Sequence, residues 1–374
     1  MKVLYDGAIY AVQQAGGANR YWAKVIDHMP EDVVPYLATN QIRSTNYPGN
    51  PRLKTYYFKR FGFRPGRASF CLEKLFFRAV MLGQPFDIFH PSIYTENAAQ
   101  VPLRKFRCPI VITILDMIEE LYPESDPSGL RQRQKAQALA AASAVICISH
   151  NTKKDLLERY PNLKAPITVT HLASELNSRM AEGDEPVPDR PYFLYVGARH
   201  AAYKNFDGLL AAFDRIAKEC PEVVLCLAGP PLTADEQRSL AGFELQDRVH
   251  HAGQPGDSHL AKLYRCSLAL VYPSLYEGFG IPPLEAMACG TIAVAANRAS
   301  LPEIMGDAGL LFNPLAADDL AQILSAIARG EINRAEMIER GSRRAAQFSW
   351  ERTAAQTYTV YHNLGVRTQN PPPR

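Results

Sequence analysis

Apolar positions along the chain gather in short β-rich runs, and longer stretches with helical spacing separate these runs. The runs of the first half are KVLY, FDIFH, PIVITIL and AVICIS, and those of the second half are PYFLYVG, VVLCLAG, RVHHAG, SLALVYPS and TIAVAAN. Most of them are continuously apolar, which indicates strands that are covered on both faces. The pattern therefore predicts parallel sheets with helical crossovers.

A division into two doubly wound α/β domains follows from where the two sets of runs stop and resume. Residues 178–191, SRMAEGDEPVPDRP, combine charges, a glycine and three prolines, and predict a linker between an N-terminal domain over 1–177 and a C-terminal domain over 192–349. The length of 374 residues also exceeds what one hydrophobic core usually supports. The tail contains TQNPPPR, and we expect residues 366–374 to be disordered. In such sheets ligands bind at the carboxyl ends of strands, so chemistry is expected in the loops after the strands.

Composition narrows the classes of function. Apolar residues at 47% and charged residues at 21% weigh against disorder, and a formal net charge of +3 does not indicate a nucleic-acid partner. The seven cysteines form no C-x-x-C pair, the nine histidines are dispersed and D-x-D is absent, so we expect no disulfide framework, no metal and no other cofactor. The N-terminus MKVLYDGAIY has the pattern of a strand and not of a signal peptide, and no apolar run reaches the ~18 residues of a membrane span. These features predict a protein of the reducing cytoplasm.

The stretch YPSLYEGFGIPPLEAMACG places two glutamates, Glu277 and Glu285, eight positions apart around a turn. Glycines at 278 and 280 permit a tight turn after the buried strand, and the two prolines that follow suit the start of a helix. Glu285 is then expected in the first helical turn, where complementing the helix dipole alone would contribute ~0.3–1 kcal/mol. Glu277 precedes the turn and gains nothing from the dipole. We therefore expect a binding site here, with the amides of Gly278, Phe279 and Gly280 directed at an anion or a sugar hydroxyl.

This strand, turn and helix with its two glutamates resembles the E-x7-E signature of retaining glycosyltransferases of family 4. The resemblance implies the GT-B fold, in which two Rossmann-like domains with doubly wound parallel sheets face a central cleft. It also implies that a C-terminal helix at about 350–365 packs back on the N-terminal domain. In the family the first glutamate faces the donor sugar and the second accepts hydrogen bonds from the nucleotide ribose, which implies these roles for Glu277 and Glu285. Two acceptor oxygens on a carboxylate match the adjacent hydroxyls of a ribose.

Two further segments resemble the same family. YVGARHAAYKNFDGLLAAF is similar to the segment whose arginine and lysine clamp the donor diphosphate, which implies that role for Arg199 and Lys204; solvated basic residues in a loop are the alternative. With these two cations a divalent ion is not required. In AVQQAGGANRYWAKVI, Gly16 and Gly17 resemble paired glycines that bring backbone amides close to the donor phosphates, although a Gly-Gly turn before a helix is often only a turn.

One departure from the family lies in VITILDMIEELYPE. Many members have a histidine before the aspartate, where it contacts the donor sugar, whereas this chain has Leu115 before Asp116. Either the sugar lacks the hydroxyl that such a histidine binds, or another group replaces it. His90, at the end of a neighbouring strand, is the candidate, and we expect His90 or Asp116 at the sugar or acceptor. A structural histidine is the alternative.

The resemblance implies a retaining, metal-independent hexosyltransferase in which Glu277, Arg199 and Lys204 act on the donor. We expect GDP-mannose or a related GDP-6-deoxyhexose as donor, and a saccharide or polyprenyl-linked glycan as acceptor, in the biosynthesis of a polysaccharide such as lipopolysaccharide. A transferase of the same fold that uses a UDP-hexose is the close alternative. A catalytically silent nucleotide-binding subunit, a sugar epimerase and a phosphorylase are further alternatives, whereas a dehydrogenase is disfavoured because no G-x-G-x-x-G follows a strand.

A basic and aromatic segment spans residues 52–78, RLKTYYFKRFGFRPGRASFCLEKLFFR, with eight Lys or Arg against one Glu. This mixture suits an anionic membrane surface, where each basic residue contributes ~1 kcal/mol, and it also suits single-stranded nucleic acid. Alternatively, the phenylalanines pack a core and the arginines are solvated. Since a lipid-linked acceptor favours the membrane, we expect peripheral attachment to the inner face of the plasma membrane and no nucleic-acid partner. The basic residues expected to hold the membrane are Lys59, Arg60, Arg64 and Arg67.

Overall fold

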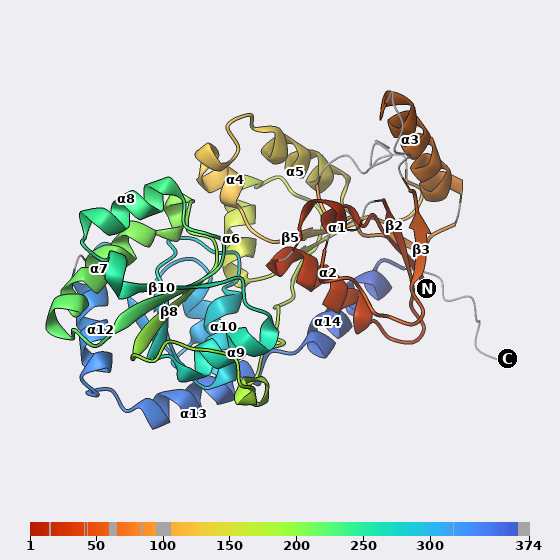
Figure 1. Ribbon diagram of the computed structural model, residues 1–374. Coiled ribbons are helices and arrows are strands. Elements are labelled where there is room, and N and C mark those ends of the chain that lie inside the picture. The colour runs from red at the N-terminus through yellow and green to blue at the C-terminus, as the bar shows by residue number, and fades with distance from the viewer. Residues whose placement is uncertain are drawn as a thin grey trace. The chain divides into compact units, whose positions relative to one another are not determined.

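The computed structural model describes residues 1–14, 16–40, 42, 44–59, 66–83, 85–94, 106–316 and 318–365, and for 66–68 and 70 it describes the backbone alone. The tail predicted to be disordered, 366–374, lies outside these residues. The chain divides into two compact units: unit 1 is Met1–Leu172 with Trp350–Arg374, and unit 2 is Ala173–Ser349. Both units are built on parallel β-sheets with flanking helices, which confirms the predicted α/β fold class (Figure 1).

The described part of unit 1 contains a sheet of order β3-β2-β1-β4 and a sheet of order β5-β6-β7. The strands are β1 (Lys2–Tyr5), β2 (Val34–Thr39), β3 (Lys54–Tyr57), β4 (Ile88–Phe89), β5 (Val111–Ile114), β6 (Ala144–Cys147) and β7 (Ile167–Val169). A parallel bridge between Phe89 and Ile110 joins the two sheets. The carboxyl ends of β1, β4 and β5 are therefore neighbours, and the loops predicted to carry glycines 16 and 17, His90 and Asp116 all start from this edge.

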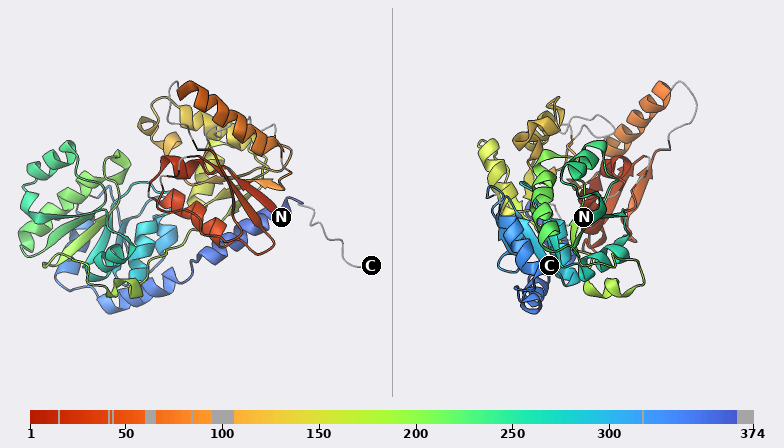
Figure 2. Two further views of the ribbon diagram at one scale, coloured as in Figure 1. Left: turned by 45° about the vertical axis from the view of Figure 1, so that its right-hand side comes forward. Right: turned by 60° about the vertical axis from the view of Figure 1, so that its left-hand side comes forward.

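Helices cover the sheets of unit 1, and the chain returns to this unit at its C-terminal end. The helices are α1 (Ala8–Val12), α2 (Gly17–Asp27), α3 (Gly66–Gly83), α4 (Ile118–Leu121), the 3-10 helix η2 (Pro123–Ser125), α5 (Leu130–Ala141), α6 (His150–Arg159) and α14 (Trp350–Asn363). In α2 the buried residues Tyr21, Trp22, Val25 and Ile26 recur at helical spacing. α14 packs beside α2 (Figure 2), and the Thr353 hydroxyl donates to the His171 carbonyl oxygen at 2.6 Å.

Unit 2 is built on a six-stranded parallel sheet of order β10-β9-β8-β11-β12-β13 in its described residues. The strands are β8 (Tyr192–Val196), β9 (Val224–Ala228), β10 (Val249–Gly253), β11 (Ala269–Tyr272), β12 (Ile292–Ala296) and β13 (Leu310–Phe312). The helices are η3 (Ser178–Glu182), η4 (Ala202–Lys204), α7 (Phe206–Glu219), α8 (Ala234–Gly242), η5 (Gln246–Arg248), α9 (Asp257–Cys266), α10 (Ile281–Cys289), α11 (Leu301–Met305), α12 (Asp319–Ala328) and α13 (Arg334–Ala345).

The strand order of unit 2 reverses between β8 and β11. From β8 the chain moves outward to β9 and β10, and it then crosses back to β11 on the other side of β8. Figure 1 shows α7 and α12 on one side of the sheet and α9 and α10 on the other. Such a reversal opens a crevice at the carboxyl edge of an α/β sheet. The loops after β8 and β11 carry Lys204 and Glu277, so two predicted site residues flank this point.

The segment predicted as a linker, residues 178–191, is instead packed into unit 2. Its first part forms η3, which contacts α9. Three basic side chains of α9 bind carbonyl oxygens of the segment: Arg265 binds that of Ser178 at 3.0 Å, His259 that of Pro186 at 2.7 Å, and Lys262 that of Gly183. The carbonyl groups of Gly183 and Pro186 lie outside helices and strands, so the bonds from Lys262 and His259 satisfy acceptors that have no place in a helix or sheet. Unit 2 accordingly begins at Ala173, before the predicted linker.

None of the described helices is both long enough and apolar enough to cross a bilayer. Of the basic residues expected to hold a membrane, Lys59 is exposed, whereas Arg60, Arg64 and the side chain of Arg67 lie outside the described residues.

Candidate functional site

The carboxyl ends of β8 and β9 approach each other closely in unit 2, and glycines make this approach feasible. The Gly197 amide donates to the Ala228 carbonyl oxygen at 2.9 Å. Gly229 has φ 151°, and a Cβ atom there would lie 2.5 Å from the Gly197 carbonyl oxygen. A side chain at Gly229 would therefore push the two loops apart. The two backbones are thus in direct contact here, and the Arg199 Nη1 lies 3.4 Å from the Gly197 carbonyl oxygen.

The loop between β11 and α10 is held by a residue that the sequence did not indicate. The buried Ser300 hydroxyl lies 2.8 Å from the Glu277 carbonyl oxygen and 2.7 Å from the Phe279 carbonyl oxygen. Gly280 has φ 106°, and a Cβ atom there would meet Leu301 at 2.7 Å. The ring of Phe279 is buried and packs edge-on against Phe348, with centroids 6.0 Å apart. These contacts give the loop one backbone conformation, in which two of its carbonyl groups bind Ser300.

Glu277 binds two side chains through one carboxylate oxygen. The Lys204 Nζ donates to Glu277 Oε1 at 2.6 Å, and the Tyr272 hydroxyl donates to the same oxygen at 2.8 Å. The side chains of Lys204 and Glu277 are 17% and 13% exposed, so the ion pair reaches the surface only in part. Burial, and next the charge of Glu277, raise the pKa of Tyr272 well above 10, so this phenol stays a neutral hydrogen-bond donor. The sequence pointed to Lys204 and Glu277, but not to Tyr272.

Glu285 lies on α10 with its carboxylate directed into unit 2. It is the fifth residue of the helix, just beyond the first turn in which it was expected, because α10 begins at Ile281. Its Oε2 accepts a hydrogen bond from the buried Tyr264 hydroxyl at 2.9 Å, and Glu285 itself is 6% exposed. Burial first, and the Glu285 charge second, raise the pKa of Tyr264 well above its usual value. Dipole compensation does not explain this buried carboxylate, since its position is not at the helix terminus.

Arg199 is buried among protein acceptors in this structure. Its Nε lies 3.2 Å from Glu236 Oε1, its Nη2 donates to the Pro230 carbonyl oxygen, and its guanidinium lies 5.8 Å from the ring centroid of Phe206. Glu236 also accepts from the Thr233 amide in the capping box of α8. Arg199 therefore ties the loop after β8 to the loop after β9. Its predicted contact with a diphosphate stays a prediction, and Lys204 is the cation of this segment that meets Glu277.

The paired glycines of unit 1 lie at the start of α2. Gly16 is the N-cap, with φ 155°, and Gly17 is the first helical residue. The Gln13 side chain folds over this turn: its Oε1 accepts from the Asn19 amide at 2.9 Å, and its Nε2 lies 2.7 Å from where a Cβ of Gly16 would be. The turn is thus a compact helix start at the carboxyl edge of β1.

Asp116 follows β5 and is tied to an ionic cluster that the sequence did not reveal. Lys135, fully buried on α5, donates to Glu119 at 2.9 Å, to Glu120 at 2.8 Å and to the Asp116 carbonyl oxygen at 3.1 Å. The Tyr160 hydroxyl completes the cluster by donating to Glu120 at 3.0 Å. Burial raises the pKa of the Asp116 carboxyl, and the positive charge of Lys135 opposes that shift. Lys135 stands in the polar run RQRQKAQ, which resembles a solvated helix face.

His90 is a core residue in this structure. It is 0% exposed, with its Nδ1 2.6 Å from the Tyr361 hydroxyl and its Nε2 2.8 Å from the Thr113 hydroxyl. The Trp22 ring packs against it at 4.6 Å between centroids. Burial lowers its pKa to about 3, so the ring is neutral. Because both nitrogens bind protein groups, the geometry agrees with the alternative of a structural histidine.

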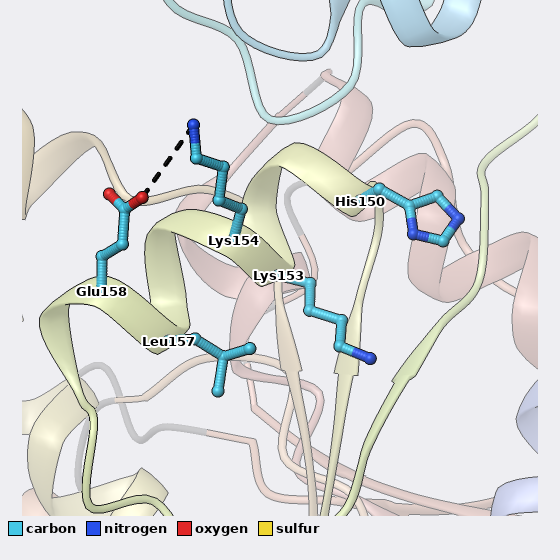
Figure 3. Close-up of a pocket in the computed structure, with 5 residues that line it drawn as sticks. All are labelled: His150, Lys153, Lys154, Leu157 and Glu158. Atoms are coloured by element: carbon cyan, nitrogen blue, oxygen red, sulfur yellow. Dashed lines mark ion pairs between the residues drawn. The ribbon is translucent and has the colours of Figure 1, made fainter.

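A surface hollow of about 470 Å³ lies along one face of α6 in unit 1 (Figure 3). It is lined by His150, Lys153, Lys154, Leu157 and Glu158, all from this helix. Figure 3 shows the ion pair of Lys154 with Glu158, whose atoms are 3.9 Å apart. None of the predicted site residues lines this hollow.

Comparisons with known proteins find relatives of both units. The family model "Glycosyl transferases group 1" matches residues 180–344, and the model "Glycosyltransferase Family 4" matches residues 15–173. O-antigen chain mannosyltransferase B of Escherichia coli is 30% identical over 293 residues, which cover 74% of this chain and 74% of that protein. MMP alpha-(1->4)-mannosyltransferase of Mycolicibacterium hassiacum is 36% identical over 182 residues, which cover 48% of this chain and 44% of that protein.

A solved structure supports the fold over nearly the whole chain. Sucrose-phosphate synthase from Thermosynechococcus elongatus matches with a TM-score of 0.76 and 23% identity, covering 97% of this chain and 98% of that chain. At this identity the likeness concerns the fold alone. With the two parallel-sheet units, it confirms the predicted GT-B class.

Proposed function

The chain belongs to glycosyltransferase family 4, and on that premise we propose that it is a retaining mannosyltransferase that uses a GDP-linked donor. The family makes it a hexosyltransferase of glycan biosynthesis. We propose more specifically that the donor is GDP-mannose or a related GDP-6-deoxyhexose and that the acceptor is a saccharide or a lipid-linked saccharide. The two mannosyltransferases among its relatives support the choice of sugar.

One observation carries the proposal: a carboxylate, a cation and a phenol meet where the strand order of unit 2 reverses. Glu277 accepts from Lys204 and from Tyr272 there, and α10, which follows the same loop, carries the buried carboxylate of Glu285. A nucleotide sugar needs a cation for its diphosphate and acceptors for its hydroxyls. Lys204 supplies the first, whereas Glu277 and Glu285 supply the second.

The proposed reaction exchanges one bond for another on the same face of the sugar. The bond from the anomeric carbon to the diphosphate oxygen breaks, and the acceptor oxygen forms the new bond to that carbon. The proton of the acceptor hydroxyl passes to the departing phosphate oxygen, so no strong general base is required. Lys204 stabilises the charge that grows on the leaving diphosphate, while Glu277 holds the sugar for attack. With Arg199 near the same strand edge, the positive charge comes from side chains and no metal is needed.

Calorimetry with free nucleotides tests the site assignment. GDP should bind the parent protein more tightly than UDP or dTDP, and Glu285→Ala and Lys204→Ala should each weaken the binding of GDP. Loss of one charged hydrogen bond costs ~1.5–3 kcal/mol, which is about a 10- to 150-fold loss of affinity. Lys218→Ala is the matched control, because Lys218 forms an exposed ion pair with Asp214 on α7. Unchanged affinity in both site variants would refute the assignment.

Product analysis tests the reaction itself. The protein should transfer mannose from GDP-mannose, and nuclear magnetic resonance of the product should show the anomeric configuration of the donor. Turnover with a UDP-hexose alone would identify the alternative donor class. Tight GDP binding without turnover on any acceptor would favour the silent nucleotide-binding subunit.

A further inference from the structure

Asn205 has a backbone conformation that residues other than glycine rarely adopt. Its φ of 53° and ψ of 42° lie in the left-handed helical region. Among the described residues, the other non-glycine positions with positive φ are Glu244 and Ala299. Ala299 directly precedes Ser300, which binds the loop after β11, and Asn205 directly follows Lys204. Two of these three positions therefore adjoin the proposed donor site, and unusual backbone conformations cluster at such sites.

The side chain of Asn205 does not act as its place in the helix predicts. Asn205 is the N-cap of α7, where an asparagine usually accepts a hydrogen bond from an amide of the first turn. In the described helix α7 this side chain makes no capping bond. Its Nδ2 instead donates to the Pro273 carbonyl oxygen at 3.3 Å, and Pro273 directly follows β11. The side chain thus connects two loops at the carboxyl edge of the sheet.

A second hydrogen bond joins the same two loops on the other side of Lys204. There the Leu275 amide donates to the Tyr203 carbonyl oxygen at 2.7 Å. The backbone of Lys204 is therefore held through the residue before it and through the residue after it. Both bonds end in the short segment between β11 and Glu277. The two backbones that carry the ion pair of Lys204 and Glu277 are consequently tied to each other.

The surroundings of Asn205 select one orientation of its side chain. A Cβ atom at Gly208 would lie 2.5 Å from the Oδ1 of Asn205, so the glycine leaves the space that this side chain fills. Both backbone groups of Asn205 are also bonded: its amide donates to the Ala202 carbonyl oxygen at 3.0 Å, and its carbonyl accepts from the Leu209 amide at 3.3 Å. The left-handed turn and the direction of the side chain are therefore fixed together.

We propose that Asn205 is a positioning residue that fixes the backbone of Lys204, so that only the lysine side chain has to move when a diphosphate replaces Glu277 as its partner. A cation that is placed before the ligand arrives loses less freedom on binding. It can also stabilise the charge of a leaving group without reorganisation. The inference rests on the proposed function, because it takes a nucleoside diphosphate as the ligand of Lys204.

Two substitutions separate the hydrogen bond of Asn205 from its backbone conformation. Asn205→Gly removes the side chain but adopts the left-handed conformation without strain, whereas Asn205→Ala removes the side chain and keeps the strain. Both variants should bind GDP about fivefold more weakly, which corresponds to the loss of one neutral hydrogen bond. Their kcat/KM for GDP-mannose should fall by a similar factor. The affinity for guanosine, which lacks the diphosphate, should be unchanged.

Combination with Lys204→Ala shows whether Asn205 acts through the lysine. If it does, Asn205→Gly should change GDP affinity by less than about twofold in the Lys204→Ala background. A purely structural role would give the same loss in both backgrounds. Asn333→Gly is the matched control, because Asn333 is the N-cap of α13 and its side chain accepts from the Glu336 amide at 3.3 Å. This control should leave GDP affinity and turnover unchanged.

The outcomes differ from those that test the proposed function. Parental GDP affinity and kcat/KM in an Asn205→Gly variant with unchanged thermal unfolding would overturn the inference. Equal losses of affinity for GDP and guanosine, or additive losses in the double variant, would overturn it as well. If the parent binds UDP instead, the same comparison is made with UDP and uridine. A parent that binds no nucleoside diphosphate would refute the proposed function and the inference with it.

Discussion

The hydroxyl of Tyr272 offers the sharpest test of how Glu277 is held. Tyr272→Phe removes the donor that lies 2.8 Å from Glu277 Oε1 and leaves the ring, which is 4% exposed, in place. Lys204 still binds the same oxygen at 2.6 Å, so the carboxylate keeps its counter-charge but loses one of its two described restraints. The sequence position of Tyr272, at the last residue of β11, gave no hint of this role.

The expected effect is on turnover and not on nucleotide affinity. A hydrogen bond to a charged group contributes ~1.5–3 kcal/mol. We take the lower end, because Glu277 is 13% exposed and water can replace part of the bond. If Glu277 holds the sugar in the transition state, kcat should fall by about tenfold, while the KM for the donor and the affinity for GDP should change less than about twofold.

Steady-state kinetics with GDP-mannose should be measured from about pH 6 to about pH 9. The pKa of Tyr272 lies well above 10, so the phenol keeps its proton throughout, and the ratio of parent to variant kcat should not change with pH. Tyr195→Phe is the control: its hydroxyl is also buried in unit 2 but donates to the Ala198 carbonyl oxygen at 2.8 Å. A Tyr272→Phe variant with parental kcat and an intact fold would show that the phenol does not position Glu277. Equal losses in both variants would assign the effect to packing.

Two predictions concern buried charge in unit 1. Lys135→Met leaves Glu119 and Glu120 without their shared cation and should lower the free energy of unfolding by about 3–5 kcal/mol in denaturant titrations. Adding Glu120→Gln to this variant should recover part of the loss. Equal stability of the parent and Lys135→Met would contradict the cluster. The pKa of His90 is lowered from 6.5 to about 3, so the unfolded state binds more protons than the folded state between these values. Acidification from about pH 6.5 to about pH 4.5 should therefore remove about 2 kcal/mol of stability through this residue. His90→Gln should therefore lose less stability than the parent over that range, and identical slopes would show that His90 is not buried in its neutral form.

Much of the fold could be predicted because its signals are local in sequence. Continuous apolar runs such as VVLCLAG mark buried parallel strands, and β9 (Val224–Ala228) is buried throughout. The boundary between the two units was harder to predict from the sequence. Prolines and charges in residues 178–191 predicted a linker. The carbonyl groups of that segment instead bind basic side chains of α9, and the bonded residues are 73 to 87 positions apart in the sequence.

The site was predictable where one loop carries the chemistry and not where distant residues complete it. Glu277 and Glu285 lie eight positions apart on either side of one loop, so their spacing in the sequence was enough to predict a site. The contribution of Ser300 depends on how α11 meets that turn, and Tyr264 reaches Glu285 from another helix. Side-chain direction at such long-range contacts follows from packing, which residue type does not encode.

The ion pair between Lys204 and Glu277 implies an order of events when a donor binds. Without a ligand each group neutralises the other, at 2.6 Å and with little exposure, so neither is left as a charge without a partner. A diphosphate carries more negative charge than one carboxylate and would compete for Lys204. Glu277 would then keep Tyr272 as its donor and gain a free acceptor for a sugar hydroxyl. In this account Tyr272 is needed most when Lys204 has moved to the diphosphate, which is why its removal should appear in turnover and leave the unliganded fold nearly unchanged.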